Sequence, residues 1–428
     1  MRIGLFTDTY KPSINGIVYV VESLKTHLEA MGHEVYVFCP ARSVRPSKQA
    51  EKFDEDEHIV RFPSLKGAFY DDYDTSFFFP PRVMMQVRDL DFDMIHVFTQ
   101  GQVGLMGIQA AWVTKTPFVI QHCTDVYEFV EHYPAVLPGA LALITLVVPF
   151  TVRLQGKDVK ELIKLYRPRR GATEWNQDII EKSMTIVYSK ADAVITLSRK
   201  SSEQLEGWQQ GDKFRYPLVM MPNGVTPIKK ATAAELRDFK DRWGIDNTDE
   251  VFGFVGRLGE EKNLPILIKA LGHVLKVRPR ARLLFVGDFE FREKLEEMAA
   301  ATAYNDRITF TGALPRDQLG AAYGVMSVFT FPSLKDTQAW VLHEAAHAGL
   351  PIVLIDRKLS EVFEDGENGY FAKNTPRDMA DKIIELLKSP KKRADFGAHG
   401  KKLAGKFTER GQVKKLVKLY EEIIESRQ

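Results

Sequence analysis

The chain has 428 residues, of which 44% are hydrophobic and 27% charged, as is typical of a globular protein of two or three domains. Its formal net charge of +2 argues against a nucleic-acid-binding protein, so any contact with phosphate or anionic lipid must come from a local patch. The two cysteines, Cys39 and Cys123, exclude a disulfide framework and fit a reducing compartment. The apolar start "MRIGLF" is too short for a signal peptide, and no uninterrupted apolar run reaches about 18 residues, so we expect no membrane-spanning helix.

Short apolar runs alternate with amphipathic helical patterns in the first half of the chain. The runs predict strands at 3–6, 34–38, 93–98, 117–121 and 192–197. Between the first two, the apolar residues of the segment 17–31 recur on one helical face. Strands that alternate with helices predict a parallel, doubly wound sheet.

The same alternation restarts after a turn-rich stretch at 220–230. Strands are predicted at 251–256, 282–287, 307–312, 327–333 and 351–356, and an amphipathic helix at 411–425 has no strand after it. We therefore predict two α/β domains, 1–223 and 224–407, with residues 408–428 forming a helix that returns to the first domain.

Ligands of open α/β sheets lie beyond the carboxyl ends of the strands, so the loops that follow strands are the first place to look for chemistry. "VGRLGEEKN" (255–263) puts Arg257 and Lys262 in such a loop, before a helix. Two cations beside a helix N-terminus suit a diphosphate, which arginine can hold with a forked pair of hydrogen bonds. The alternative is a surface turn in which Glu260 and Glu261 pair with these cations.

Two further strand ends carry candidate residues. Gly16 lies between the first strand and the first helix, where a glycine lets the backbone approach an anion. His122 follows the strand 117–121. A simple turn glycine and a structural histidine are the alternatives.

"KDTQAWVLHEA" (335–345) places two carboxylates, Asp336 and Glu344, around the start of a predicted helix at 339–348. Eight residues of helix separate them by about 10 Å, which is too far for an acid/base pair on one bond but suits two contacts to an extended ligand. Thr337 and Gln338 add polar groups. The alternative is an N-cap aspartate and a solvent-exposed glutamate.

Taken together, these segments resemble the family 4 retaining glycosyltransferases over nearly the whole chain. The resemblance is carried in order by "FTDTYKPSINGIVYVVESLKTHLEAMGHEVYVFCP", "SKADAVITLS", "MPNGV", "GRLGEEKN", "TQAWVLHEAAHAGLPIV" and "ENGYF". It implies the GT-B fold, in which two Rossmann-like domains face each other across a cleft: an acceptor-binding domain at 1–223 and a domain at 224–407 that binds the nucleotide sugar.

The resemblance also implies roles for individual residues. Arg257 and Lys262 match the pair that holds the diphosphate of the donor, and Gly16 matches the glycine that approaches it. His122 matches the histidine near the transferred sugar, and Asp336 and Glu344 match the acidic positions of the family's E-x7-E motif. The backbone around Gln338, Ala339 and Trp340 then approaches sugar and phosphate, with Thr337 beside it, while Glu344 binds the ribose.

The chain departs from the family pattern at three positions: Asp336 replaces the usual glutamate, and Ala339 and Phe289 occupy positions where glycine is common. In this family Arg and Lys neutralise the diphosphate, so the resemblance implies neither a cofactor nor an obligatory metal. An acceptor hydroxyl attacks from the face that the nucleotide leaves, with retention at the anomeric carbon.

The acceptor is predicted from a segment at about 134–176. An apolar stretch interrupted by prolines is followed by a basic amphipathic pattern that includes Arg153, Lys157, Lys160, Lys164 and Arg167. Such a pattern is typical of a helix on an anionic membrane surface, and a buried helix or an oligomer contact is the alternative.

The motifs most resemble the diacylglycerol and glycolipid glucosyltransferases. We expect a peripheral enzyme at the cytoplasmic face of the membrane that moves a hexose, with UDP-glucose as the expected donor, to a lipid such as diacylglycerol. The alternatives are a soluble sugar or polysaccharide acceptor, a sugar-nucleotide epimerase, and a non-catalytic protein that binds nucleotide sugars.

The membrane interpretation predicts that the protein co-sediments with liposomes of anionic lipid at low salt, because each basic residue near the surface contributes about 1 kcal/mol. Added salt should release it, since the attraction is screened. If the protein stays in the supernatant at low salt, segment 134–176 does not bind the membrane.

Overall fold

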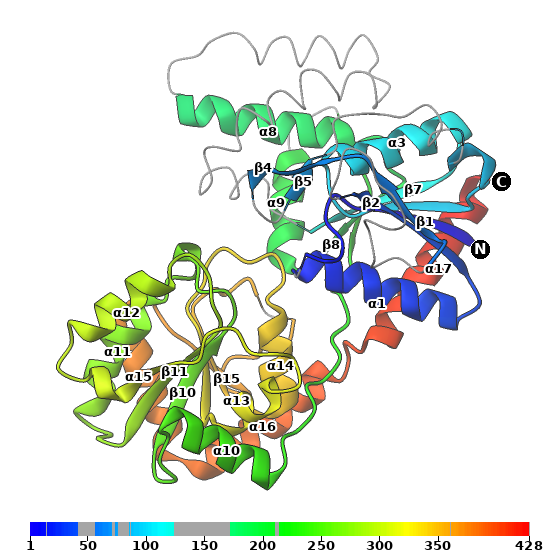
Figure 1. The fold of residues 1–428 in the computed structure, drawn as a ribbon. Helices are drawn as coiled ribbons and strands as arrows, with labels where there is room; N and C mark the ends of the chain where they lie inside the picture. The colour runs from blue at the N-terminus through cyan, green and yellow to red at the C-terminus, as the bar shows by residue number, and fades with distance from the viewer. Residues whose placement is uncertain are drawn as a thin grey trace. The chain divides into compact units, whose positions relative to one another are not determined.

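The structure is a computed structural model of the chain and describes residues 1–13, 15–41, 56–70, 73–75, 85, 87–123, 172–209, 214–359 and 361–427. The chain divides into two compact units, which Figure 1 shows with the path of the chain between them. Unit 1 comprises Met1–Asn223 and Glu409–Gln428, and unit 2 comprises Gly224–Thr408.

Unit 1 contains a parallel sheet whose strands lie, in the described residues, in the order β3-β2-β1-β6-β7-β8-β9. These strands are β1 (Arg2–Phe6), β2 (Glu34–Pro40), β3 (Ile59–Phe62), β6 (Met94–Val97), β7 (Phe118–His122), β8 (Ala193–Thr196) and β9 (Leu218–Met220). A separate antiparallel pair is formed by β4 (Leu65–Tyr70) and β5 (Tyr73–Thr75). Strands β6, β7 and β8 are buried along their whole length, which explains why their sequences are mostly apolar and show no alternation with exposed polar residues.

Helices cover both faces of this sheet. Buried residues of α1 (Gly16–Ala30) and α17 (Glu409–Arg427) form one cluster with the strands. A second cluster contains residues of α3 (Gln102–Thr114), α8 (Ala172–Tyr188) and α9 (Arg199–Gln209). Unit 1 is therefore a three-layer, doubly wound α/β domain.

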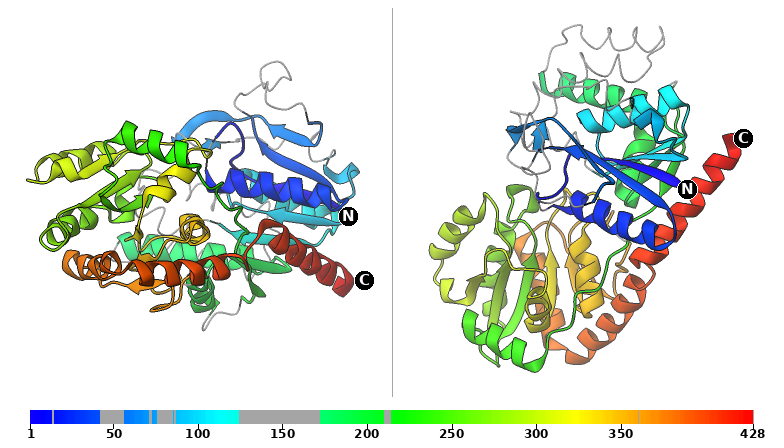
Figure 2. Two further views of the ribbon diagram at one scale, coloured as in Figure 1. Left: turned by 90° about the horizontal axis from the view of Figure 1, so that it is seen from below. Right: turned by 45° about the vertical axis from the view of Figure 1, so that its right-hand side comes forward.

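Helix α17 completes one face of unit 1, although it follows unit 2 in the sequence. Figure 2 shows it beside α1. Tyr420 is fully buried, and its hydroxyl lies 2.6 Å from Nδ1 of His96 on β6. Arg427 forms an ion pair with Asp192, with 2.7 Å between Nη2 and Oδ1.

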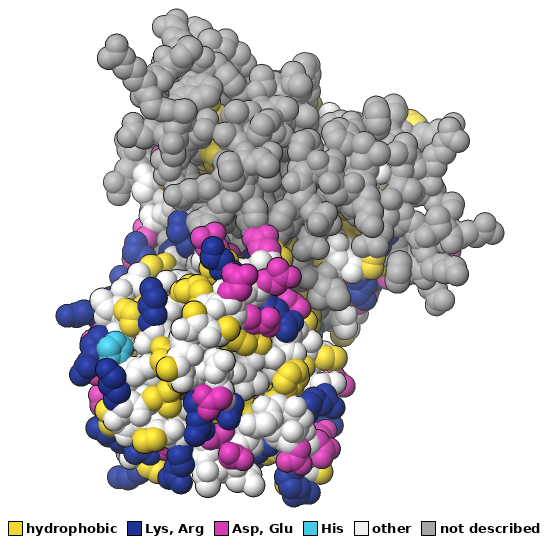
Figure 3. Space-filling model, turned by 60° about the vertical axis from the view of Figure 1, so that its left-hand side comes forward, with side chains coloured by type: hydrophobic (Ala, Val, Ile, Leu, Met, Phe, Trp, Pro, Cys, Tyr) yellow, Lys and Arg dark blue, Asp and Glu magenta, His cyan; other side chains and the backbone are white. Residues whose placement is uncertain are grey.

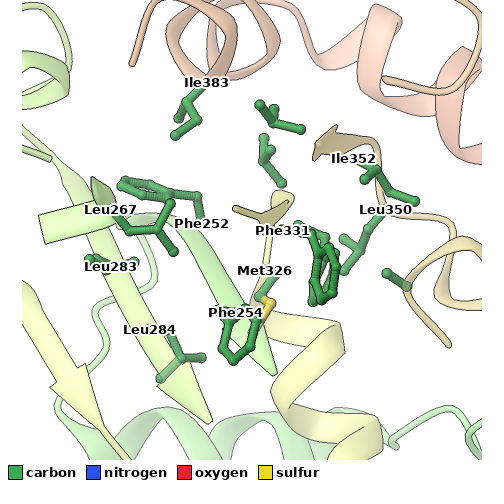
Figure 4. Close-up of a cluster of buried hydrophobic side chains, with 14 of the residues drawn as sticks. Phe252, Phe254, Leu267, Leu283, Leu284, Met326, Phe331, Leu350, Ile352 and Ile383 are labelled. Atoms are coloured by element: carbon green, nitrogen blue, oxygen red, sulfur yellow. The ribbon is translucent and has the colours of Figure 1, made fainter. Parts of the chain in front are cut away.

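Unit 2 contains a second parallel sheet, in which the described strands have the order β12-β11-β10-β13-β14-β15. They are β10 (Glu250–Val255), β11 (Ala281–Val286), β12 (Ile308–Phe310), β13 (Val328–Phe331), β14 (Ile352–Leu354) and β15 (Gly369–Phe371). Figure 4 shows side chains of these strands, such as Phe252, Leu283 and Phe331, packed with Leu267 and Ile383 from the helices. The hydrophobic core of unit 2 is thus separate from those of unit 1.

The helices of unit 2 follow the strands as the sequence alternation predicts. They are α10 (Ala233–Trp243), α11 (Pro265–Leu275), α12 (Arg292–Ala300), α13 (Leu319–Val325), α14 (Trp340–Ala348), α15 (Pro376–Lys388) and α16 (Pro390–Ala404), with single 3-10 turns η3 (Glu260–Lys262) and η4 (Asn305–Arg307). Two doubly wound parallel-sheet domains confirm the predicted fold class.

The described surface of unit 2 carries both signs of charge. Figure 3 shows Lys and Arg side chains interspersed with Asp and Glu side chains on the face that it draws. This mixture agrees with the net charge of +2. Among the described residues, no helix is long and apolar enough to cross a membrane.

The contact between β6 and α17 predicts a pH dependence of stability. Burial lowers the pKa of His96 to about 3, whereas an unfolded histidine titrates near 6.5. Between these pH values the unfolded chain binds a proton that the folded chain does not, so the free energy of unfolding of unit 1 falls as the pH is lowered from 6.5 towards 3.

Urea unfolding of unit 1 at about pH 7.5 and about pH 5 measures this slope. His96→Gln should flatten it, because glutamine takes up no proton in the unfolded chain. An unaltered slope in His96→Gln would contradict the assignment to His96.

Candidate active site

The loops that follow β10 and β13 lie next to each other at the carboxyl edge of the unit 2 sheet. The two strands are paired through Phe252 with Val328 and Gly253 with Phe329. Gly256, directly after β10, has a φ of 143°, a conformation that favours glycine. This turn directs residues 257–263 toward the loop 332–339.

An ion pair joins these two loops. Nζ of Lys262 lies 2.7 Å from Oδ1 of Asp336, and both side chains are largely buried. The neighbouring Asn263 donates from Nδ2 to the carbonyl of Pro332 at 3.2 Å and to Oδ1 of Asn374 at 2.9 Å. The structure thus brings together two residues that sequence reasoning assigned to the donor site for separate reasons.

Arg257 lies in the same loop as Lys262 but in a different environment. Its side chain is 54% exposed, and one of its nitrogens lies 3.6 Å from Oε1 of Glu261. Its guanidinium carbon lies 4.7 Å from the centre of the Phe289 ring. Nζ of Lys262 is 3.8 Å from the same Glu261 oxygen, so the predicted alternative, in which a loop glutamate pairs with the cations, holds in part.

Glu344 lies on α14 and is almost completely buried, with 5% of its surface exposed. Nη1 of Arg316 donates to its Oε1 at 3.0 Å, and the hydroxyl of Tyr323 donates to its Oε2 at 2.8 Å. Burial raises the pKa of Glu344, while the hydrogen bond from Tyr323 and the charge of Arg316 oppose this rise. The alternative of a solvent-exposed Glu344 is wrong.

Arg316 and Tyr323 were missed by the sequence reasoning. A buried carboxylate requires hydrogen-bond donors, but its partners come from the loop before α13 and from α13 itself, at no fixed spacing from Glu344. Arg316 also donates from Nη2 to the carbonyl of Thr226 at 3.1 Å. Helix α14 is therefore held in place by two side chains that come from α13 and the loop before it.

The residues between the two carboxylates form the entrance to α14. The helix begins at Trp340, one residue later than predicted, and its N-cap residue is Ala339, for which the structure gives no side-chain cap. Asp336 is therefore not the N-cap, and that alternative is wrong as well. Thr337 and Gln338 lie in the loop just before the helix, where its first N–H groups have no partners within the helix.

A histidine within α14 contacts the loop that leads into α14, and a phenylalanine after α16 packs against that histidine. Nε2 of Gln338 lies 3.5 Å from Nε2 of His343, whose ring contacts Phe407 edge-on at 5.4 Å. Burial lowers the pKa of His343 to about 3. A neutral imidazole at this point suits packing under the loop.

The other two predicted site residues lie in unit 1. His122 is at the end of β7, as predicted, but its ring is fully buried, with Nδ1 2.7 Å from the hydroxyl of Tyr188 and the ring edge-on to Trp208. Gly16 begins α1, and Oδ1 of Asn15 caps the helix by accepting from the amides of Ile17 and Val18. A Cβ at Gly16 would meet no atom within 4 Å.

The basic residues predicted to meet the membrane or acceptor belong to segment 134–176. Arg153, Lys157, Lys160, Lys164 and Arg167 lie outside the described residues, as does most of segment 134–176. Their assignment remains a prediction from the sequence.

The site in unit 2 is therefore an exposed arginine, a buried lysine with an aspartate partner, and the N-terminus of a helix, all at the carboxyl edge of a parallel sheet. Cations and a helix N-terminus at one edge can hold an anionic group such as a diphosphate. The aspartate can accept hydrogen bonds from hydroxyl groups beside it.

Comparison with protein families gives two matches that together span most of the chain. Residues 14–227 match the model described as Glycosyltransferase Family 4, and residues 237–403 match the model described as Glycosyl transferases group 1. The second match contains Arg257, Lys262, Asp336 and Glu344.

Individual proteins agree with this assignment. The chain is 28% identical to an alpha-monoglucosyldiacylglycerol synthase of Acholeplasma laidlawii, over 91% of this chain and 89% of that protein. It is 26% identical to a GDP-mannose-dependent alpha-mannosyltransferase of Mycolicibacterium smegmatis, over 83% and 80% of the two chains. The crystal structure of Anabaena HepE in complex with UDP has the same fold, with a TM-score of 0.68 and 15% identity over 99% of this chain and all of that one.

The fold, the order of the motifs and the match over half of the chain lead to one conclusion. This chain belongs to glycosyltransferase family 4 and has the GT-B type of fold.

Proposed function

We propose that the protein transfers a hexose from a nucleoside diphosphate sugar, UDP-glucose, to a lipid hydroxyl acceptor such as diacylglycerol. The observation that carries this proposal is the Lys262–Asp336 ion pair beside Arg257, at the carboxyl edge of unit 2 in a family 4 glycosyltransferase. The named activity of the Acholeplasma laidlawii relative supports glucose as the sugar and diacylglycerol as the acceptor.

In this proposal, Arg257 and Lys262 neutralise the diphosphate as the bond from the sugar C1 to the phosphate oxygen breaks. Negative charge grows on that oxygen in the transition state, and preorganised cations stabilise it there more than in the ground state. The acceptor hydroxyl forms the new bond to C1 from the same face, and its proton passes to the leaving phosphate oxygen. The anomeric configuration is retained.

Asp336 and Glu344 bind two different parts of the donor. Asp336 accepts hydrogen bonds from sugar hydroxyls, and it shares Lys262 with the diphosphate. Glu344 accepts from the ribose: each of its oxygens already accepts one hydrogen bond and has a second lone pair available. The amides at the start of α14, around Gln338, Ala339 and Trp340, face the phosphate, with Thr337 beside them.

His122 and Gly16 belong to the same proposal on the side of unit 1. The family motifs that His122 and Gly16 match imply that His122 contacts the transferred sugar and that Gly16 approaches the donor phosphates. The buried position of the His122 ring favours a role in holding the end of β7 in place over a role in proton transfer. Cation side chains take the place of a metal ion at the diphosphate, so no metal is required.

The acceptor side of the proposal rests on the relatives and on the sequence of segment 134–176. Basic residues of that segment bring the enzyme to anionic lipid at the cytoplasmic face of the membrane, where a diacylglycerol hydroxyl is available. A GDP-linked donor is the second candidate, because the mannosyltransferase relative is named as GDP-mannose-dependent. A soluble sugar acceptor keeps the same chemistry.

Release of nucleoside diphosphate from UDP-, GDP- and ADP-hexoses, with and without anionic vesicles that contain diacylglycerol, tests the donor and acceptor together. We expect release of UDP from UDP-glucose only when the vesicles are present. Release without lipid would contradict the lipid acceptor, and binding without any release would contradict transfer.

Asp336→Ala should lower kcat by at least about a hundredfold, because it removes a sugar contact and the nearer of the two carboxylates around Lys262. The dissociation constant of UDP, measured by calorimetry, should rise less than about tenfold. Asp317→Ala, at an exposed acidic position of the same unit, is the control. Unchanged turnover in Asp336→Ala would remove Asp336 from the site.

A further inference from the structure

Phe289 lies directly beyond β11, in the loop next to the one that carries Arg257. The family commonly has glycine at this position, and glycine has no side chain that could contact Arg257. In this chain the Phe289 ring lies under the Arg257 guanidinium, with 4.7 Å between the guanidinium carbon and the ring centre. This distance is within the range of a cation–π interaction.

Backbone hydrogen bonds join the loops after β10 and β11. They hold in place the two backbone segments that carry Arg257 and Phe289. The amide of Leu258 donates to the carbonyl of Asp288 at 3.2 Å, and the amide of Phe291 donates to the carbonyl of Leu258 at 3.1 Å. Gly256 and Gly287 are in such close contact that a Cβ on Gly287 would lie 1.9 Å from the Gly256 carbonyl oxygen. The loops after β10 and β11 therefore form one unit.

The backbone of Phe289 is itself held on both sides. Its amide donates to Oδ1 of Asp288 at 2.9 Å, and its carbonyl accepts from the amide of Arg292, where α12 begins, at 3.1 Å. The ring is partly buried. The backbone of Phe289 is thus held at both its N–H and its C=O.

Arg257 and Lys262 are oriented in different ways. The lysine is 11% exposed and has a carboxylate at 2.7 Å, whereas the arginine is 54% exposed and its nearest carboxylate, on Glu261, is 3.6 Å away. A contact with a ring uses the charge of the guanidinium and consumes none of its N–H donors. The ring can therefore restrict the arginine and leave its donors available for phosphate oxygens.

We infer that Phe289 is a positioning residue that orients Arg257 toward the diphosphate of the donor. This inference rests on the proposed function, in which Arg257 holds that diphosphate. By restricting the arginine before the donor arrives, the ring lowers the entropy that is lost on binding and keeps the charge in place as the leaving group forms.

The first experiment compares Phe289→Leu with Phe289→Tyr, using UDP-glucose turnover in the presence of diacylglycerol vesicles and calorimetric binding of UDP. Phe289→Leu should lower kcat/KM about two- to fivefold, as expected for the loss of one exposed cation–π contact. Phe289→Tyr keeps a ring and should remain close to the wild type. Phe291→Leu, whose ring packs on the unit 2 core in the same loop, controls for general loosening of the loop.

The second experiment is a double-mutant cycle with Arg257→Met. If the ring acts through the arginine, Phe289→Leu has no further effect once Arg257 is replaced. An equal loss in both backgrounds, or no loss in either, overturns the role of Phe289 while Arg257→Met alone still lowers turnover. Unchanged turnover and UDP binding in Arg257→Met would instead overturn the placement of the diphosphate, and the inference with it.

Discussion

The candidate site depends on one ion pair between two loops that are 74 residues apart in the sequence. Lys262 and Asp336 lie in the loops that follow two paired strands, so the sheet brings the loops close and the ion pair fixes them to each other. Both side chains are largely buried, and the loss of either partner would leave a poorly solvated charge. The geometry of the loop after β13, and with it the entrance to α14, follows from this contact.

Charge in unit 2 is distributed so that an incoming anion meets cations of two kinds. Arg257 is exposed and weakly paired, whereas Lys262 already has a counter-ion in Asp336. In the proposed reaction, a diphosphate adds to the first and competes with the carboxylate for the second. Glu344 takes no part in this competition, because Arg316 and Tyr323 hold its carboxylate in the interior. The two acidic positions of the motif are therefore in different electrostatic environments, which the sequence spacing alone does not distinguish.

Strands that are buried on both faces were predictable because their sequences are mostly apolar, as in β6 (Met94–Val97) and β11 (Ala281–Val286), each of which contains a single polar or charged residue. The strands β3, β9 and β15 were not predicted; each has three or four residues, and most of their positions are exposed or half-buried. In the site, the positions of Asp336 and Lys262 followed from motifs after strands. The partners of Glu344 did not, because a contact between α14 and Arg316 is made by tertiary packing and has no local pattern.

Because α17 belongs to unit 1, the ribosome makes the whole of unit 2 before it makes the last helix of unit 1. The amide of Val225 donates to the carbonyl of Phe407, so unit 2 closes on itself with all of its strands and helices between these two residues. The packing of unit 1, by contrast, is complete only when Tyr420 and the rest of α17 cover β6 and α1. On the ribosome, the first unit to begin is therefore the last to be completed, and until then an apolar face of its sheet remains uncovered and available to chaperones.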